Sequence, residues 1–281
     1  MAPAVTRIIA PNPGVMTGPG TNTYILGSDP LVLIDPGPDD DSHLGAILDA
    51  VGDGRLGWIL VTHTHIDHAP LAVRLRERTG AAVAGFGPPA VAMVGPDGVD
   101  RNQTLAFDRL LADGDRLHAG ELAIQAVHTP GHASNHLCFL VAGSGLLFSG
   151  DLVMSGSTVV IAPPDGDMAV YLESLEKVRA LAPGRIAPGH GEVMDDPAAV
   201  VDGYLAHRRE REAQVLAAVG SAPAGGLTSE QLVAVIYTGV PALLHPVARY
   251  SVWAHLRKLG AEGRARSADP DDIAAPWTLV R

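Results

Sequence analysis

The sequence contains a single cysteine, Cys138, in 281 residues. One thiol excludes an intrachain disulfide and any metal site built from several thiolates. Long apolar runs are also absent, since none approaches the roughly 18–20 residues needed to span a membrane. The opening stretch MAPAVTRIIAPNPG has no continuous apolar segment of the kind found in signal peptides. We therefore expect a cytoplasmic protein with no membrane partner, and we expect Cys138 to lie in the core.

Aromatic residues make up only 4% of the chain, whereas hydrophobic residues reach 47% and charged residues 18%. This composition is typical of a globular protein with one large domain, or with one large and one small domain. The net charge of −11 is unevenly spread: residues 205–281 hold nine Lys/Arg and seven Asp/Glu, which leaves −13 for the remainder. That small positive excess suits a segment facing nucleic acid, and it suits a neutral small domain equally well.

Hydrophobic periodicity predicts strands alternating with helices in residues 1–204, with hairpins among them. Residues 87–112 give no clear pattern. We predict an α+β fold in which helices pack outside a pair of mixed sheets. The expected strands cover 23–26, 31–34, 56–61, 81–86 and a short segment around 186, the hairpins 116–127 and 136–148, and the helices 42–51, 71–78 and 169–181.

The C-terminal part, residues 205–281, reads as a second, smaller domain. A long helix over 198–219 leads into it, and the stretch SAPAGG follows. Thr228 and Gln231 have the spacing of a capping box and so predict the start of another helix. A further helix over 247–259 and two short strands within 266–281 complete the pattern, which favours a winged helix-turn-helix.

The stretch VTHTHIDHAP, residues 61–70, places His63, His65, Asp67 and His68 directly after an apolar run. A solvated polar loop is one explanation. Imidazole and carboxylate groups are also the ligands that zinc and similar ions take. His63 and His65 would share a face of a continued strand, whereas Asp67 and His68 would point elsewhere, which suits a second ion beside the first.

Three further candidates follow predicted strands, and each comes directly after a glycine: His132, Asp151 and His190. Any one alone would be a surface or core residue in most proteins. Four strand-end sites meeting at one edge are an arrangement that polar loops do not need and that an active site does.

THTHIDHA, TPGH, SGD and PGHG, in this order, resemble the metallo-β-lactamase superfamily, an αββα sandwich, over about residues 5–200. NPGVMTGPGTNTYILG, LIDPG, HTPGHASNH and the C-terminal module are similar to its LACTB2-like branch. That branch joins such a domain to a winged-helix domain, and this likeness covers nearly the whole chain.

The resemblance implies two divalent metal ions, zinc above all, although manganese or iron would also suit the donors. Asp35, in LIDPG, resembles the aspartate that orients a ligand in this superfamily; capping of a turn is the alternative. The first ion would take His63, His65 and His132, the second Asp67, His68 and His190, and Asp151 would bridge them.

Two such ions can hold a bridging hydroxide at neutral pH, so the expected activity is hydrolysis, with Asp67 as a catalytic residue. His136 is a candidate proton donor, with a structural role as the alternative. The branch resemblance implies an endoribonuclease acting on single-stranded RNA. Hydrolysis of a small thioester or ester, as in glyoxalase II-like members, is the alternative; lactam hydrolysis and a non-enzymatic metal-sensing regulator rank below both.

RNA would need positive charge on the winged module. Arg208, Arg209 and Arg211 on the long helix would extend such a surface, but aromatic stacking partners are few. The alternatives are that the module covers the mouth of the active site or mediates a homodimer. The candidate RNA contacts are Arg257, Lys258, Arg264 and Arg266.

Overall fold

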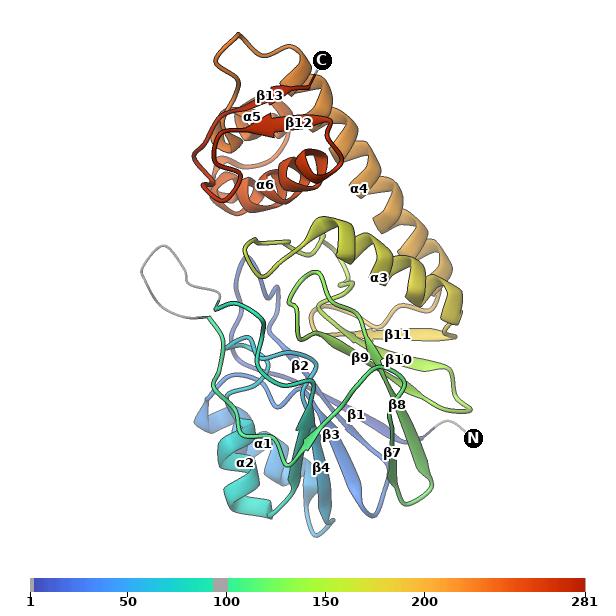
Figure 1. The fold of residues 1–281 in the computed structure, drawn as a ribbon. Coiled ribbons are helices and arrows are strands. Elements are labelled where there is room, and N and C mark those ends of the chain that lie inside the picture. Colours follow the sequence, from blue (N-terminus) through green and yellow to red (C-terminus); the bar gives the residue numbers. More distant parts are fainter. Residues whose placement is uncertain (1–2, 93–100, 281) are drawn as a thin grey trace.

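Two β-sheets lie face to face in the computed structural model, which describes residues 3–92 and 101–280 (Figure 1). The strand orders are β1-β2-β3-β4-β5-β6 and β11-β10-β9-β8-β7. The first sheet comprises β1 (Val5–Ile9), β2 (Asn22–Leu26), β3 (Leu31–Ile34), β4 (Leu56–Leu60), β5 (Ala82–Gly85) and β6 (Arg109–Leu110). The second comprises β7 (Arg116–Ala119), β8 (Leu122–His128), β9 (Leu137–Val141), β10 (Leu146–Gly150) and β11 (Arg185–Pro188).

Helices cover the outer faces of both sheets. α1 (Asp41–Val51) and α2 (Ala72–Thr79) pack on the first sheet, where Ile47 and Leu75 are fully buried. α3 (Met168–Leu181) and the start of α4 (Pro197–Gly220) pack on the second, through residues such as Tyr171. Side chains of both sheets fill the space between them. The predicted α+β sandwich of mixed sheets with outer helices is thus confirmed.

Two strands were not predicted, and both are weak in the sequence for a physical reason. β1 (Val5–Ile9) is an edge strand whose side chains are exposed or half-buried, so it lacks a strong apolar signal. β6 (Arg109–Leu110) is only two residues long. It lies within 87–112, the stretch without a clear pattern, of which residues 93–100 fall outside the described part. Cys138 is fully buried, as expected, and burial raises the pKa of its thiol to about 12.

The direction of the strands brings the polar motifs together. β3, β4 and β5 run parallel, and β10 runs parallel to β11 and antiparallel to β9, which is antiparallel to β8. β8, β10 and β11 therefore end at the same edge of their sheet. The loops after β3, β4, β8, β10 and β11 all carry candidate site residues.

The C-terminal part rises from the sandwich on α4, a helix of 24 residues that contains the predicted domain boundary at 204/205 (Figure 1). Its small core contains Val215, Leu232, Leu256 and the fully buried Trp277. No helix in the described ranges combines the length and apolarity needed to cross a bilayer. The elements after α4 are α5 (Ser229–Ile236), η1 (Ala242–Leu244), α6 (His245–Ala261), β12 (Ala265–Ser267) and β13 (Trp277–Leu279).

Local sequence explains how the small domain begins. Thr228 caps α5 through its side chain, and the Gln231 side chain bonds back to the Thr228 backbone. This is the capping box that the spacing predicted, and it satisfies two N–H groups that the first turn would leave unpaired.

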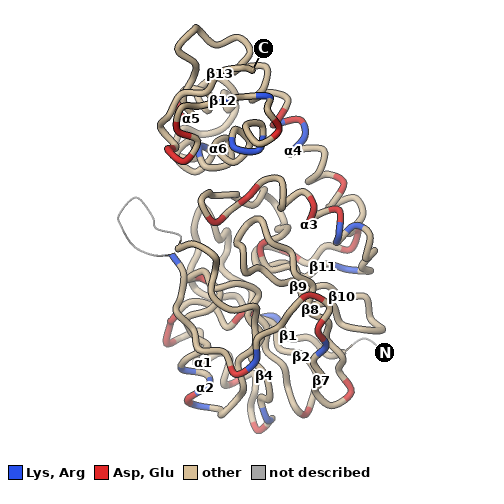
Figure 2. The backbone as a smooth tube through the Cα atoms, in the orientation of Figure 1, with Lys and Arg blue, Asp and Glu red and all other residues tan. Residues whose placement is uncertain are grey.

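An ion-pair network joins α4 to α6. Lys258 Nζ lies 2.9 Å from Glu212 Oε2, and Arg264 Nη1 lies 3.5 Å from Glu212 Oε1. Glu262 contacts both cations as well. Acidic and basic segments consequently alternate where α6 and β12 face α4 (Figure 2). Burial would raise the pKa of Glu212, but hydrogen bonds from His255 and Lys258 prevail and lower it to about 2.

Glu212→Gln should lower the melting temperature at pH 7 by roughly 2–4 °C, because it leaves Lys258 without one of its carboxylates. The folded-state pKa lies below the ordinary value of 4.5, so this stabilisation is complete above about pH 5.5 and declines as the pH falls toward 2. Melting curves of both proteins at pH 7, 5 and 3.5 test this. A gap that widens on acidification would contradict the assignment.

Candidate metal centre

Five loops at one edge of the sandwich supply the candidate ligands. His63, His65, Asp67 and His68 follow β4, and Asp35 follows β3 in the same sheet. In the other sheet the ligands follow β8, β10 and β11, and they are His132, Asp151 and His190. The structure thus brings together all seven residues that the sequence put forward as metal ligands.

Three imidazole nitrogens form the first cluster. His65 Nδ1 lies 2.9 Å from His63 Nε2 and 3.1 Å from His132 Nε2. A tetrahedral ion with bonds of about 2.0–2.1 Å holds its nitrogen ligands about 3.3 Å apart. The three atoms therefore have nearly the mutual spacing that a shared ion imposes.

The second cluster has Asp67, His68 and His190 around a common point. The two Nε2 atoms lie 3.2 Å apart, and Asp67 Oδ2 lies 3.4 Å from His190 Nε2. Asp151 stands between the clusters: its Oδ2 is 3.6 Å from His132 Nε2, and its Oδ1 is 3.4 Å from both His68 Nε2 and His190 Nε2. One oxygen faces each cluster, which is the geometry of a bridging carboxylate.

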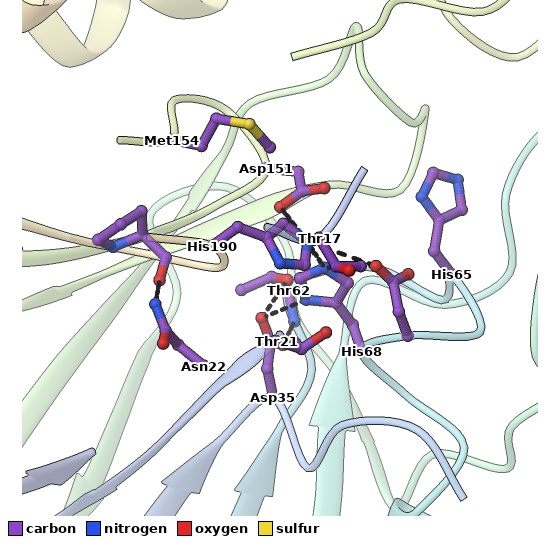
Figure 3. A network of polar contacts seen from close by, with 12 residues as sticks. Thr17, Thr21, Asn22, Asp35, Thr62, His65, His68, Asp151, Met154 and His190 are labelled. Carbon is purple, nitrogen blue, oxygen red and sulfur yellow. Dashed lines mark hydrogen bonds and ion pairs between the residues drawn. The ribbon is translucent and has the colours of Figure 1, made fainter. Parts of the chain in front are cut away.

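Asp35 fixes how the histidines present their nitrogens. It is 2% exposed and accepts hydrogen bonds from the Thr62 backbone N–H and hydroxyl, each at 2.8 Å, and from His68 Nδ1 at 2.9 Å. Figure 3 shows Asp35 and Asp151 approaching His68 from opposite sides. With the proton on Nδ1, His68 Nε2 keeps a lone pair for an ion. These contacts support the orienting role expected for Asp35.

In His132 and His63, too, Nδ1 is bonded to a neighbouring oxygen. His132 Nδ1 donates to Val160 O at 2.8 Å, and His63 Nδ1 bonds Thr62 Oγ1 at 3.0 Å. Each arrangement leaves Nε2 as the free donor atom. His65 is the exception, since its Nδ1 faces the cluster and its buried Nε2 has no partner among the described residues. The tautomers therefore suit metal ligation better than a network of histidines bonded to one another.

The electrostatics also suit a cation. Burial alone would lower the pKa of His68, yet Asp67, Asp151 and Asp35 raise it well above its ordinary range. Asp151 Oδ1 is buried without a hydrogen-bond partner in the described structure. Several carboxylates buried this close together need a positive charge beside them, and divalent ions supply one. The donors present fit divalent metal ions.

Sequence comparison agrees with this geometry. Residues 16–190 match the family model described as the metallo-beta-lactamase superfamily. The chain belongs to the metallo-beta-lactamase superfamily. Residues 228–277 match a second family, the beta-lactamase associated winged helix domain. The predicted order of a metallo-β-lactamase sandwich followed by a winged helix is therefore confirmed, and superfamily membership makes the chain a hydrolase of a generally metal-dependent class.

Relatives resemble the chain over most of its length. The beta-lactamase-like protein 2 homolog of Drosophila melanogaster is 35% identical, covering 96% of this chain and 92% of its own. The atrochrysone carboxyl ACP thioesterase of Aspergillus fumigatus is 31% identical over 86% of this chain and 76% of its own. A beta-lactamase domain protein from Burkholderia ambifaria shares the fold, with a TM-score of 0.81, 23% identity and coverage of 98% of this chain and 91% of that one.

His136 is fully buried beside the residues of the candidate metal centre. Its Nε2 accepts from the Asp151 backbone N–H at 3.0 Å, and its Nδ1 bonds Thr129 Oγ1 at 2.9 Å. Burial lowers its pKa well below the usual range, and nearby histidines add to the effect. One nitrogen thus holds the Asp151 loop and the other bonds Thr129 after β8, an arrangement that favours the structural role over proton donation.

Asn22 and Tyr24 were not among the predicted site residues, but both hold the loop that carries His190. Asn22 Nδ2 donates to Pro188 O at 2.9 Å and to Gly191 O at 2.8 Å, and Tyr24 OH donates to Pro188 O at 2.9 Å. A polar Thr-Asn-Thr triplet at the start of a buried strand was the signal that could have revealed them.

A cavity of about 600 Å³ opens onto the ligand clusters of the metallo-β-lactamase domain. His65, Asp67, His132, Asp151 and His190 form one end of it. The opposite wall comes from α4, the segment that follows α5, η1 and α6 of the C-terminal part. The winged-helix domain therefore contributes directly to the surroundings of the metal centre.

The proposed RNA-contact residues lie elsewhere on the winged-helix domain, and acidic groups bind most of them. Arg257 pairs with Asp271. Lys258 and Arg264 share the carboxylates of Glu212 and Glu262 described above. Arg266 is exposed. Their role in RNA binding stays a prediction.

Gly189→Ala tests the centre without removing a ligand. A Cβ at Gly189 would lie 2.7 Å from both Asp151 Oδ1 and His68 Cε1, so the two ligands must move apart. We expect the metal content after reconstitution to fall from about two ions per chain to one or fewer, because site geometry sets metal affinity. Elemental analysis of the purified variant measures this.

Gly203→Ala is the matched control, since a Cβ there meets nothing within 4 Å and sits on an exposed turn of α4. It should keep the wild-type metal content and stabilise the helix slightly. Full metal occupancy in Gly189→Ala would contradict the assigned geometry.

Proposed function

We propose that this chain hydrolyses a small thioester or ester with the help of two divalent metal ions, most readily zinc. The observation that carries the proposal is the cavity of about 600 Å³ that ends on the ligand clusters. Its volume is that of a small-molecule site. Apolar side chains form much of its lining, and Val15, Met16 and Ile66, each at least 40% exposed, are among them. Such a lining, in a cavity of this size, suits the acyl chain or ring of a small substrate.

Two bound divalent ions would activate water and polarise the carbonyl oxygen of the substrate. His63, His65 and His132 would hold one ion, Asp67, His68 and His190 the other, and Asp151 both. Asp67 lies at the cavity end of the centre, where its carboxylate would orient the attacking water by accepting a hydrogen bond. Water adds to the carbonyl carbon, the carbon–sulfur bond breaks, and a carboxylic acid and a thiol result.

The leaving group also favours a thioester. A thiol has a pKa of about 8.5, so it departs as a thiolate without a dedicated proton donor. An amine or a sugar hydroxyl needs protonation as it leaves. His136, the proton donor suggested by the sequence, does not line the cavity. Thioester hydrolysis therefore makes the smallest demand on the residues present.

The thioesterase of Aspergillus fumigatus, at 31% identity, supports the same substrate class. Cleavage of single-stranded RNA remains the second candidate, because a winged-helix domain follows the hydrolase domain. RNA binding calls for a positive groove with stacking aromatics. Carboxylates instead pair with Arg257, Lys258 and Arg264. That pairing weighs against RNA as the substrate.

A substrate panel decides between these activities. The metal-reconstituted protein should release thiol from octanoyl and benzoyl thioesters of N-acetylcysteamine, and a chelator should abolish the release. A single-stranded RNA oligonucleotide, a double-stranded RNA and a chromogenic lactam serve as the competing substrates. Metal-dependent RNA cleavage without any thioester turnover would overturn the proposal in favour of the nuclease.

Asp67→Asn keeps the size of the side chain and removes its charge and basicity. If Asp67 orients the attacking water, kcat for the thioester should fall by roughly 100- to 10,000-fold. Metal content must be measured on the same sample, so that loss of the ion is separated from loss of chemistry. Asp49→Asn, on the exposed side of α1, is the control and should behave as wild type. Unchanged kcat at full metal occupancy would refute the role of Asp67.

A further inference from the structure

The cavity wall opposite the metal centre carries positive charge. His207, Arg208 and Arg211, all on α4, line it together with Tyr237 at the end of α5. Val240, Leu244 and Val247 provide an apolar surface beside them. A substrate bound at the ligand clusters would extend along this apolar surface toward the α4 side chains.

Arg208 is a buried cation without a carboxylate. It is 2% exposed, donates from Nη2 to Val159 O, and lies with its guanidinium 5.2 Å from the centre of the Tyr171 ring. Its Nε has no hydrogen-bond partner. Among the described residues no acidic side chain forms an ion pair with it. Burial of a guanidinium in this state costs free energy unless an anion joins it.

Arg211 repeats the pattern one turn further along α4. Its guanidinium lies 3.9 Å from the centre of the Tyr237 ring, and Nη1 donates to Gln214 Oε1 at 2.7 Å. Its buried Nε is also without a partner, and no carboxylate in the described ranges pairs with it. Stacking on Tyr237 holds the guanidinium at the cavity wall, and Nη1 also lies 3.5 Å from Ile236 O.

The pKa of His207 reflects its burial and the positive charge of the two neighbouring arginines. Burial lowers its pKa, and the charges of Arg208 and Arg211 lower it further. Its Nδ1 is another buried polar atom without a partner. Two adjacent guanidinium groups that line the cavity, with no carboxylate paired to either among the described residues, point to an anion as the partner for this wall.

We propose that Arg208 and Arg211 form a subsite for a carboxylate at the far end of the acyl group of the substrate. The inference rests on the proposed hydrolase function and narrows its substrate class to acyl groups with an apolar body and a distal carboxylate. Guanidinium groups bind carboxylates through charge-assisted hydrogen bonds, which are stronger than neutral ones. The scissile carbonyl would lie at the ligand clusters, and the chain would follow the apolar wall between the two ends.

The test compares adipoyl and heptanoyl thioesters of N-acetylcysteamine, which have similar length but differ in the terminal charge. The measured quantity is the ratio of their kcat/KM values. Wild-type protein should favour the adipoyl substrate. Arg211→Gln should reduce the ratio by roughly 10- to 100-fold, the effect of losing a charged hydrogen bond. Arg211→Lys should retain part of the preference, because it retains the charge.

Arg209→Gln is the matched control. Arg209 is exposed on the same helix, pairs with Glu176 at 2.9 Å and does not line the cavity. Its replacement by Gln changes the net charge by the same amount as Arg211→Gln does. It should leave the ratio at the wild-type value. Equal ratios in wild type and Arg211→Gln would overturn the subsite. A phosphopantetheine thioester of heptanoate carries its negative charge on the thiol side. If Arg211→Gln impaired hydrolysis of this substrate but not of the adipoyl thioester, the placement of the subsite on the acyl side would be overturned.

Direct binding separates this inference from the proposed function. Calorimetry with the metal-loaded protein should show that adipate binds more tightly than heptanoate, and Arg211→Gln should remove the difference. Each acid offers one carboxylate to the metal ions, so only the second carboxylate of adipate reports on the subsite. If no thioester is hydrolysed, the proposed function fails while this comparison still decides the subsite. Equal binding of the two acids by wild type would overturn it.

Discussion

The geometry of the whole centre depends on one buried carboxylate. Asp35 accepts two hydrogen bonds from Thr62 and one from His68. Loss of these bonds would leave a buried carboxylate without partners, which costs free energy. The bonds to Thr62 fix the exit of β4, and Thr62 in turn orients His63. The bond to His68 fixes its tautomer. One side chain after β3 therefore determines how a ligand from each cluster faces the centre.

Close packing of the loops adds a second constraint. Gly150 and Gly189 precede Asp151 and His190, and a Cβ at either glycine would come within 2.7 Å of neighbouring side chains. Gly150 also has φ of 46°, a conformation that side chains disfavour. The pairing of glycine with a ligand, visible in the sequence as Gly-Asp and Gly-His, thus reflects space as well as backbone conformation. The ligands can approach one another only because the preceding residue has no side chain.

Much of this arrangement was predictable because it depends on local pattern and strand direction. Ligands at strand ends meet when the strands run the same way, so the motifs sufficed to predict that His63, His132 and His190 converge. The sequence did not reveal which carboxylates would neutralise Lys258 and Arg264, since Glu212 lies on another helix. It placed Arg208 and Arg211 on an outer surface, whereas the packing of α4 turns them toward the cavity. The facing of a helix depends on tertiary contacts that no periodicity of α4 itself specifies.

Helix α4 connects the C-terminal domain to the metal centre. Along α4, Tyr204 accepts from the Met154 backbone N–H at 2.9 Å near the metal centre, and Arg208 bonds Val159 O. Arg211 then reaches the cavity wall, and Glu212 joins the ion pairs that hold α6. These contacts follow one another on a continuous helix, so α4 contacts the metal centre, the cavity wall and the winged helix in turn. The catalytic portion has a net charge of −13, yet the α4 wall of the cavity carries Arg208 and Arg211, so in the proposed subsite the placement of charge rather than its total would select the ligand.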